Sequence, residues 1–339
     1  FKKDVFKQDD AKGTGPSCLP NNFIRALYTT GDTEDTAIDP WYEFVQLCLN
    51  RVDLKLPPYF YKLTSGATIT PLVKKLPDDP RQTPECRPVA TGDIFRTLTD
   101  RFVVSRHKRI IIDKVAPQQL GVGVRAGVLI HTWGVKLTME DTHNERSDWI
   151  YVKLDQKNAH NSYPRARAQE ILDATPGLQQ MADLHRACFE PTTKLVSKGP
   201  NGVHHICDSI EAGQQGNPMM PYVYALVLDP ILKAMESRLG HHGFVRAYQD
   251  DVIIAGKHDT VLEHLDSFIE DLATVGGELA QGPGKNSYFS PAQNTHGVPP
   301  WLSRGSATMP DGTETYGFEL CGVAIGENLF RHHYNTNRF

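Results

Sequence analysis

The sequence lacks the features that mark several large classes of protein. Its 339 residues include six cysteines, with no C-x-x-C pair, so we expect neither a zinc site nor a disulfide framework. No apolar run reaches the ~18 residues that a membrane-spanning helix needs. The chain opens on Phe1 without a signal-peptide pattern, and it contains no internal repeat or low-complexity tract. We therefore expect reduced, scattered cysteines in an intracellular protein that has no membrane partner and is a piece of a longer polypeptide.

The sequence also lacks a net basic charge. The formal net charge is -4, so the whole molecule does not have the composition of a nucleic-acid-binding protein. The charge is unevenly placed, however, because residues 96–125 hold seven Lys and Arg against two Asp. Such a local patch can bind a phosphate backbone, and a solvated basic face explains the same residues equally well.

Hydrophobic periodicity predicts alternating strands and helices along most of the chain. Residues 1–22 are typical of a loop or an extended arm. Helices are predicted over 40–51, 94–112, 164–174, 178–188, the apolar stretch after Pro218, and 257–273, the last opened by a capping box from Thr260 to Glu263. Strands are predicted over 65–76 and 148–155, in a hairpin over 193–207, and on both sides of a turn within 244–256. This order indicates an α+β fold with a sheet backed by helices.

Acidic residues stand where apolar strands end. Asp250 and Asp251 lie inside the stretch AYQDDVIIAG (247–256), and Asp155 ends the strand WIYVKLD. Adjacent carboxylates repel, and burying an unpaired one costs several kcal/mol. If the two strands are neighbours, the three carboxylates meet at one sheet edge, where Mg²⁺ would offset their repulsion. A solvated turn that merely favours Asp is the alternative.

Several short motifs then resemble those of one enzyme family, in the order in which that family has them. In chain order they are GTGPSCLPNNFIRAL (13–27), TPLVKKL (70–76), RPVATGDIFRTL (87–98), LDQKNAHNSYPR (154–165), GQQGNPMMP (213–221), YQDD (248–251), GKNSYF (284–289) and FELCGVAIG (318–326). Together they resemble the reverse transcriptase domain of non-LTR retrotransposons and group II introns. Each motif is weak alone, and the ordered set is specific.

The resemblance implies a right-hand polymerase fold of fingers and palm, with a βαββ-type antiparallel sheet backed by helices and most of the thumb missing. It implies an N-terminal segment and fingers over 1–147, a palm over 148–326 with some fingers segments interleaved, and the start of a truncated thumb or connection over 327–339. The implied activity is RNA-directed DNA synthesis, the extension of a primer 3′-OH by nucleotidyl transfer. The implied partners are an RNA template, a DNA or RNA primer and dNTPs, and the nucleus would suit a eukaryotic retroelement. The sequence gives no sign of the oligomeric state.

The resemblance also implies roles for individual residues. Asp155, Asp250 and Asp251 would be the catalytic metal ligands for two Mg²⁺ ions, with Mn²⁺ as a substitute, and Asp155 and Asp250 are the first choices. Tyr248 and Gln249 would lie beside the primer end. The incoming nucleotide would be bound by Lys75 (or Lys74), Arg87, His160, Gln215, Gly216 and Lys285, the last of which would neutralise or protonate the departing pyrophosphate.

Two positions depart from the family pattern. His160 stands where the family places Phe or Tyr against the sugar, and Asn217 stands where Asp is common. The histidine leaves two alternatives open: a polymerase with relaxed sugar selectivity, or RNA synthesis. A domesticated copy that binds nucleic acid without catalysis is a further alternative, against which the three intact aspartates argue.

Overall fold

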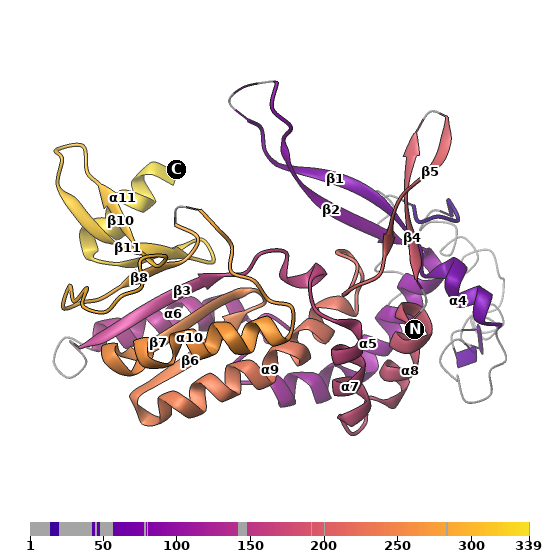
Figure 1. Ribbon diagram of the computed structural model, residues 1–339, viewed down its shortest axis with the longest axis horizontal. Helices are drawn as coiled ribbons and strands as arrows, with labels where there is room; N and C mark the ends of the chain where they lie inside the picture. Colours follow the sequence, from indigo (N-terminus) through magenta and orange to yellow (C-terminus); the bar gives the residue numbers. More distant parts are fainter. Residues whose placement is uncertain are drawn as a thin grey trace, which may run out of the picture. The chain divides into compact units, whose positions relative to one another are not determined.

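The structure is a computed structural model that folds into two compact units (Figure 1). It describes residues 14–19, 43–44, 46–47, 57–77, 79, 81–141, 148–190, 192–199, 201–282 and 284–338. Unit 1 comprises Phe1–Ile110 and Tyr163–Val223, and unit 2 comprises Ile111–Ser162 and Tyr224–Phe339. These divisions fall at other positions than the predicted domain boundaries, so the assignment of fingers and palm stays a prediction.

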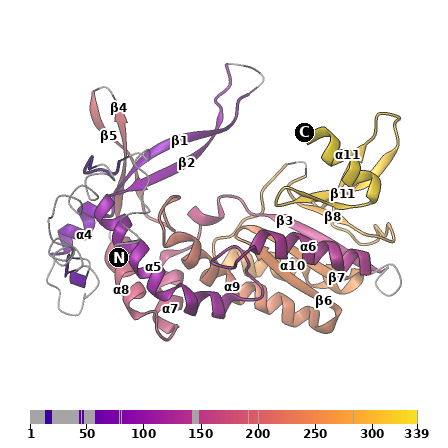
Figure 2. The same cartoon turned by 180° about the vertical axis from the view of Figure 1, so that it is seen from behind.

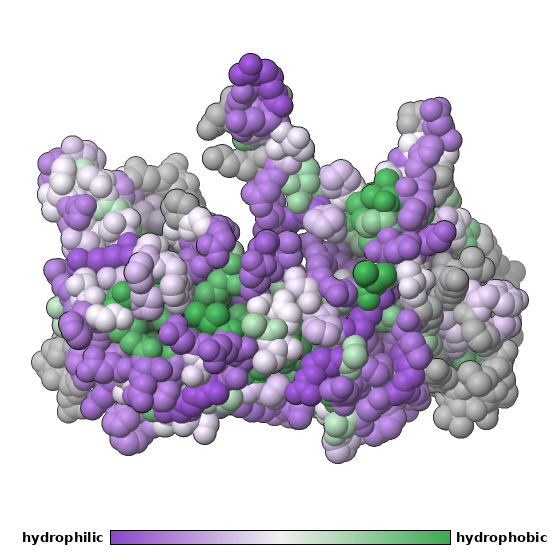
Figure 3. Space-filling model, viewed as in Figure 1, coloured by the Kyte–Doolittle hydropathy of each residue, from purple (hydrophilic) through white to green (hydrophobic). Residues whose placement is uncertain are grey.

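Unit 1 is built on a four-stranded sheet with strand order β2-β1-β4-β5. Strands β1 and β2 form one antiparallel hairpin, β4 and β5 form another, and β1 pairs with β4 in parallel. Its elements are α4 (Pro58–Thr64), β1 (Ala67–Lys75), β2 (Glu85–Gly92), the first part of α5 (Ile94–Val115), α7 (Arg165–Ala174), α8 (Gln179–Phe189), β4 (Thr193–Gly199), β5 (Gly202–Ser209) and the start of α9 (Met220–Leu239). The far end of the β1–β2 hairpin is hydrophilic in the space-filling view (Figure 3).

Unit 2 is built on a five-stranded sheet with strand order β6-β7-β3-β8-β9. All neighbouring strands in it are antiparallel except β8 and β9. Besides the rest of α5 and α9, its elements are α6 (Gly127–Asp141), β3 (Trp149–Asp155), η2 (Ala159–Asn161), η3 (Gly240–His242), β6 (Gly243–Tyr248), β7 (Asp251–Lys257), α10 (His258–Thr274), β8 (Ser287–Phe289), β9 (Ser303–Arg304), β10 (Ser306–Thr308), β11 (Glu314–Leu320), β12 (Val323–Gly326) and α11 (Asn328–Arg338).

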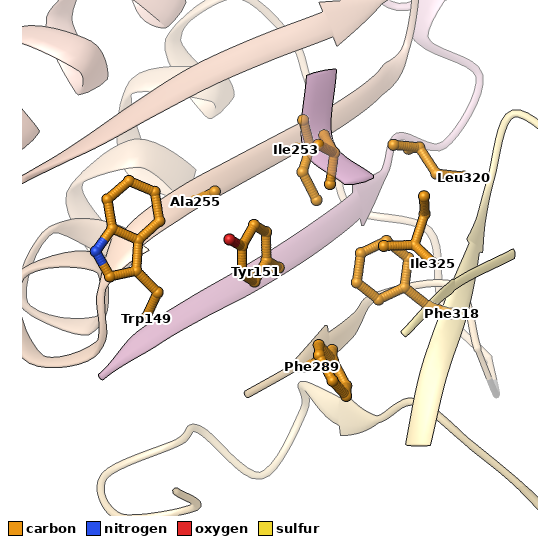
Figure 4. Packing of buried hydrophobic residues seen from close by; sticks show 9 residues of the cluster. Trp149, Tyr151, Ile253, Ala255, Phe289, Phe318, Leu320 and Ile325 are labelled. Carbon is orange, nitrogen blue, oxygen red and sulfur yellow. The ribbon is translucent and has the colours of Figure 1, made fainter. Parts of the chain in front are cut away.

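The two faces of the unit 2 sheet bury different side chains, because successive residues of a strand point to opposite faces. On one face Trp149 and Tyr151 pack with Ile253, Val135 of α6 and residues of the β11–β12 hairpin (Figure 4). Helix α10 contacts β7 and β3, and it lies in front of the sheet in Figure 1, whereas α6 lies in front in the reverse view of Figure 2. The central strands are thus covered on both sides, which explains why β3 and β7 are apolar almost throughout.

Most of the predicted elements are confirmed. The α+β class, the strands over 65–76 and 148–155, the hairpin over 193–207 and the long helix after Pro218 all match. The predicted helix over 40–51 lies largely outside the described residues, as does most of the arm over 1–22. In the part of the chain that the structure describes, no helix is long and apolar enough to span a membrane.

The capping box predicted at Thr260 and Glu263 is wrong. Helix α10 begins at His258, and its N-cap Lys257 makes no side-chain capping bond. The His258 N–H instead donates to the Asp148 carbonyl (2.9 Å), and the His258 ring is buried. This tertiary hydrogen bond satisfies one of the free N–H groups at the helix start, so the helix extends past the residue that would otherwise cap it.

Candidate active site

The three aspartates lie at one end of the central strands of unit 2. Asp155 is the last residue of β3 and Asp251 the first of β7, and the two face each other in the antiparallel register. Asp250 precedes Asp251 in the two-residue turn between β6 and β7, where Gln249 has a left-handed φ of 58°. The predicted adjacency of the two strands is therefore confirmed, and it places both carboxylate-bearing strand ends together.

The electrostatics of this end show crowded negative charge. Burial, reinforced by the Asp250 carboxylate and more weakly by Asp155, raises the pKa of Asp251, while Lys153 and Cys321 act in the opposite direction. The Cys321 thiol, in the tight turn between β11 and β12, donates to Asp251 Oδ2 (3.5 Å). Burial and the neighbouring Asp251 raise the pKa of Cys321 to about 12, so this thiol stays protonated and remains a donor.

Asp155 is held by the segment that precedes β8. The Lys285 ammonium lies 2.7 Å from Asp155 Oδ2. The buried Asn286 accepts the Asp155 N–H through Oδ1 (3.0 Å) and donates through Nδ2 to the Ala280 carbonyl (2.7 Å). The Ala280 N–H in turn donates to the Asp155 carbonyl (2.8 Å). Lys285 and Asn286 thus fix the main chain and one carboxylate oxygen of Asp155.

His160 lies next to the aspartate turn in unit 2. Its Nε2 is 3.0 Å from Gln249 Oε1, and its ring lies 4.8 Å from the ring of Tyr224. The Tyr224 hydroxyl donates to the buried Gln156 (2.8 Å), whose amide approaches the Asp250 carbonyl at 3.5 Å. His160 is therefore connected to Asp250 in two ways, through Gln249 and through Tyr224 and Gln156. Tyr248, which was expected beside the primer end, is half-buried and pairs with Asp251 in the ladder.

The other predicted nucleotide-binding residues lie in unit 1. Arg87 is exposed on β2, opposite Leu72 of β1, and Lys74 forms an ion pair with Glu85. The side chain of Lys75 lies outside the described residues. The Gln215 carbonyl accepts the Ala90 N–H (2.7 Å).

Gly216 occupies a position that only glycine fits. Its φ is +119°, and a Cβ there would lie 2.5 Å from the Ala90 carbonyl oxygen. The turn that contains Gln215 and Gly216 is therefore pressed against the main chain of β2.

Four side chains near the aspartates were not predicted: Gln119, Gln156, Asn286 and Cys321. Gln119, Gln156 and Asn286 are buried amides that bind main-chain groups of the site. Amide residues are usually exposed, and no spacing or run of residues distinguishes these from the others.

The donor chemistry of the aspartates suits a hard divalent cation. Carboxylate oxygens are the ligands that Mg²⁺ prefers, and such an ion would relieve the repulsion that adds to burial in raising the pKa of Asp251. Lys285 already supplies part of the compensating positive charge at Asp155. Across the described residues, however, no group of three or more His, Cys, Asp or Glu side chains is placed so that it could hold a metal ion. The aspartates thus suit a divalent cation by their donor atoms and by their common place at the strand ends.

Comparison with known proteins adds one relative. The chain is similar to a retrotransposon Pol polyprotein. It is 22% identical over 185 residues to the retrovirus-related Pol polyprotein from the type-1 retrotransposable element R2 of Popillia japonica. The matched part is 52% of this chain and 26% of that protein, so the match spans about a quarter of the relative's length. No protein-family model matches the chain.

Proposed function

We propose that this chain is the catalytic part of a retroelement reverse transcriptase, an RNA-directed DNA polymerase. The observation that carries the proposal is the pairing of Asp155 with Asp251 at the strand ends, with Asp250 in the adjoining turn. The ordered motifs from residue 13 to residue 326 and the similarity to an R2 Pol polyprotein support it. A nuclear site of action would follow for a eukaryotic element.

The proposed reaction transfers one nucleotide to the primer. The primer 3′-oxygen forms a bond to the α-phosphorus of a dNTP, the bond from that phosphorus to the bridging oxygen breaks, and pyrophosphate leaves. Asp155, Asp250 and Asp251 would hold Mg²⁺, which lowers the pKa of the attacking hydroxyl and stabilises charge on the leaving oxygens. The proton of the 3′-hydroxyl passes to solvent.

The chain's own residues have defined tasks in this proposal. Asn286 and Gln156 bind the main chain at Asp155 and Asp250 and so hold two carboxylates in place before substrate arrives. Lys285, with its ammonium already at the site, binds the pyrophosphate oxygens as negative charge develops there.

The remaining candidates would bind nucleic acid or nucleotide. Tyr248 and Gln249 contact the primer end, and Arg87 with Lys75 binds the triphosphate. Gln215 and Gly216 present a main-chain surface to the nucleotide and template.

The direct test is primer extension on a defined RNA template with dNTPs and Mg²⁺. Sequencing of the product distinguishes templated DNA synthesis from untemplated addition. Complementary DNA that requires template, primer and Mg²⁺ is the expected result. Binding of primer–template without any extension, across Mg²⁺ and Mn²⁺, would favour the inactive nucleic-acid-binding copy instead.

A second candidate function is polymerisation with relaxed sugar selectivity. It is favoured by His160, whose Nε2 contact with Gln249 and ring contact with Tyr224 place a polar ring beside the aspartate turn. Incorporation of dNTP and rNTP on one primer–template separates the two candidates. Strict DNA synthesis predicts strong preference for dNTP in the wild type, whereas equal use of both would establish the relaxed enzyme. The variant His160→Phe should raise dNTP preference in the second case.

A further inference from the structure

A buried glutamine outside the recognised motifs binds both main-chain groups of Gln249. Gln119 has no exposed surface. Its Oε1 accepts the N–H of Gln249 (2.8 Å), and its Nε2 donates to the Gln249 carbonyl (3.0 Å). The same Oε1 accepts the N–H of Gly121 (2.9 Å). The Gln119 side chain thus forms the two hydrogen bonds that a neighbouring strand would otherwise form with the main chain of Gln249.

The segment that carries Gln119 is itself fixed to β6. The Ala247 N–H donates to the Gln118 carbonyl (2.7 Å), and the Leu120 N–H donates to the Ala247 carbonyl (2.8 Å). Gln119 pairs with Ala247 in a parallel bridge. The segment therefore acts as a short additional strand along the edge of β6, and its side chain reaches the end of that strand.

The contact is close enough to require glycine at a neighbouring position. A Cβ on Gly121 would lie 2.4 Å from the Gln249 nitrogen. The Gly121 carbonyl also accepts the Gln249 side-chain amide (2.6 Å). Gln249 is consequently held at its N–H, its carbonyl and its side chain by residues 119–121.

Gln249, the residue that these contacts hold, has a strained main-chain conformation. Gln249 has a φ of 58°, a conformation that glycine or asparagine adopts more readily than glutamine. Such strain persists only where surrounding contacts over-determine it. Asp250 and Asp251 follow directly, so any relaxation of Gln249 would redirect their carboxylates.

We propose that Gln119 is a positioning residue that clamps the Gln249–Asp250 turn in its left-handed conformation and thereby aims the catalytic carboxylates. The clamp itself concerns only the fold of unit 2. Its catalytic consequence rests on the proposed polymerase function. Gln119 touches neither substrate nor metal and acts only through the turn.

The test compares Gln119→Met with the matched control Gln118→Met. The two substitutions are identical and adjacent, but the Gln118 side chain binds Glu236 (2.5 Å) and not the turn. A further variant, Gln119→Glu, keeps the shape and the acceptor oxygen and loses the donor to the Gln249 carbonyl. It preserves the test if Gln119→Met does not fold.

Two readouts separate the clamp from the function. In hydrogen–deuterium exchange of peptides covering 247–251, the Gln249 amide should exchange faster in Gln119→Met and keep wild-type protection in Gln118→Met. In primer extension, kcat should fall about a hundredfold in Gln119→Met, the loss that a 1 Å misplacement can cause, with the KM for dNTP changed less than about threefold. In Gln119→Glu, kcat should also fall, and the melting temperature should fall as well because a carboxylate is then buried against the Gln249 carbonyl.

Two results would overturn the proposed role of Gln119. Wild-type protection of the Gln249 amide in a folded Gln119→Met protein would overturn the clamp, and so would wild-type kcat in both Gln119 variants. If the wild-type chain does not extend primers, the proposed function fails. The exchange experiment then still decides whether Gln119 clamps the turn.

Discussion

Three carboxylates crowd the turn between β6 and β7 and the adjoining end of β3. Asp250 and Asp251 stand side by side within a mostly apolar hairpin, where unpaired carboxylates are costly. Asp155 adds a third carboxylate from the neighbouring strand, and Lys285 is the cation that contacts it. Such crowding lowers stability, and the proposed function would account for it through a bound cation.

A buried histidine in unit 1 gives a prediction about stability. Burial, with smaller contributions from Arg96 and Arg165, lowers the pKa of His185 to about 3. The unfolded chain takes up a proton near pH 6.5, whereas the folded chain does not until about pH 3. The stabilising difference is therefore complete above pH 6.5 and is lost as the pH falls toward 3. From pH 7 to pH 5 this residue should remove about 2 kcal/mol of unfolding free energy.

Urea unfolding of the wild type and His185→Gln at pH 7 and pH 5 measures this contribution. The variant should lose about 2 kcal/mol less over that interval. The exposed His296→Gln serves as the control and should follow the wild type. Equal pH dependence in all three proteins would show that His185 has the same pKa in the folded and unfolded states.

The sequence predicted some residues of the site and not others, for a physical reason. The aspartates were predictable because charge inside an apolar strand contradicts its surroundings, which a sequence displays directly. Gln119, Gln156 and Asn286 were not predictable because an amide is compatible with almost any environment. Their importance comes from main-chain groups that lie 94 to 131 positions away, such as Asp155 for Asn286 and Gln249 for Gln119.

At the scale of elements, periodicity predicted strands and helices well and their ends less well. Strand β3 and helix α9 follow from apolar runs whose burial is confirmed. The start of α10 does not follow from its capping box, because the Asp148 carbonyl binds His258 first. Helix ends depend on a few hydrogen bonds, and a tertiary partner for one of them is enough to move the boundary.

The loop between β5 and α9 contains the Gln215–Gly216 turn and is fixed from α5. Asn217 Nδ2 donates to the fully buried Asp100 Oδ2 (2.5 Å), and Arg96 Nε donates to the same oxygen (3.2 Å). Asn217 Oδ1 also accepts the Met219 N–H (2.8 Å) just before α9 begins. The side-chain amide of Asn217 thus serves as the hydrogen-bond donor that the buried Asp100 carboxylate needs.

Replacing Asn217 with Asp should therefore destabilise the protein. Two carboxylates would share one buried position with a single arginine, at a cost of about 2 kcal/mol or more. Thermal unfolding of Asn217→Asp, Asp100→Asn and the double variant checks this. The double variant exchanges amide and carboxylate, so it should be more stable than the sum of the single effects. Strict additivity would mean that the two side chains do not interact.

At the scale of the whole molecule, a net charge of -4 conceals a basic segment. Helix α5 exposes Arg106 and Lys108 in unit 1, and α10 exposes acidic residues such as Glu263 in unit 2. Charge of one sign on one element can bind a phosphate backbone even in an acidic protein. The far end of the β1–β2 hairpin, hydrophilic in Figure 3, belongs to the same unit.

Binding of a primer–template should weaken steeply with salt, and α5 should account for part of the effect. If Arg106 and Lys108 each neutralise a phosphate, the double variant Arg106→Glu/Lys108→Glu should reduce the slope of log Kobs against log salt by about 2. Fluorescence anisotropy over a range of KCl concentrations measures it. Lys257→Glu, exposed at the end of β7, is the control and should leave the slope unchanged. An unchanged slope in the double variant would remove α5 from the interface.

In the proposed polymerase, Asp155, Asp250 and Asp251 form one catalytic centre, and one assay decides whether they do. Primer extension on an RNA template is measured for the wild type, for Asp155→Asn and Asp250→Asn, and for Asp259→Asn, which changes an exposed aspartate on α10. Mg²⁺-dependent DNA synthesis is expected from the wild type and Asp259→Asn. A loss of activity of at least about a thousandfold is expected in Asp155→Asn and Asp250→Asn, with primer–template binding retained. Wild-type extension by Asp155→Asn or Asp250→Asn would contradict it.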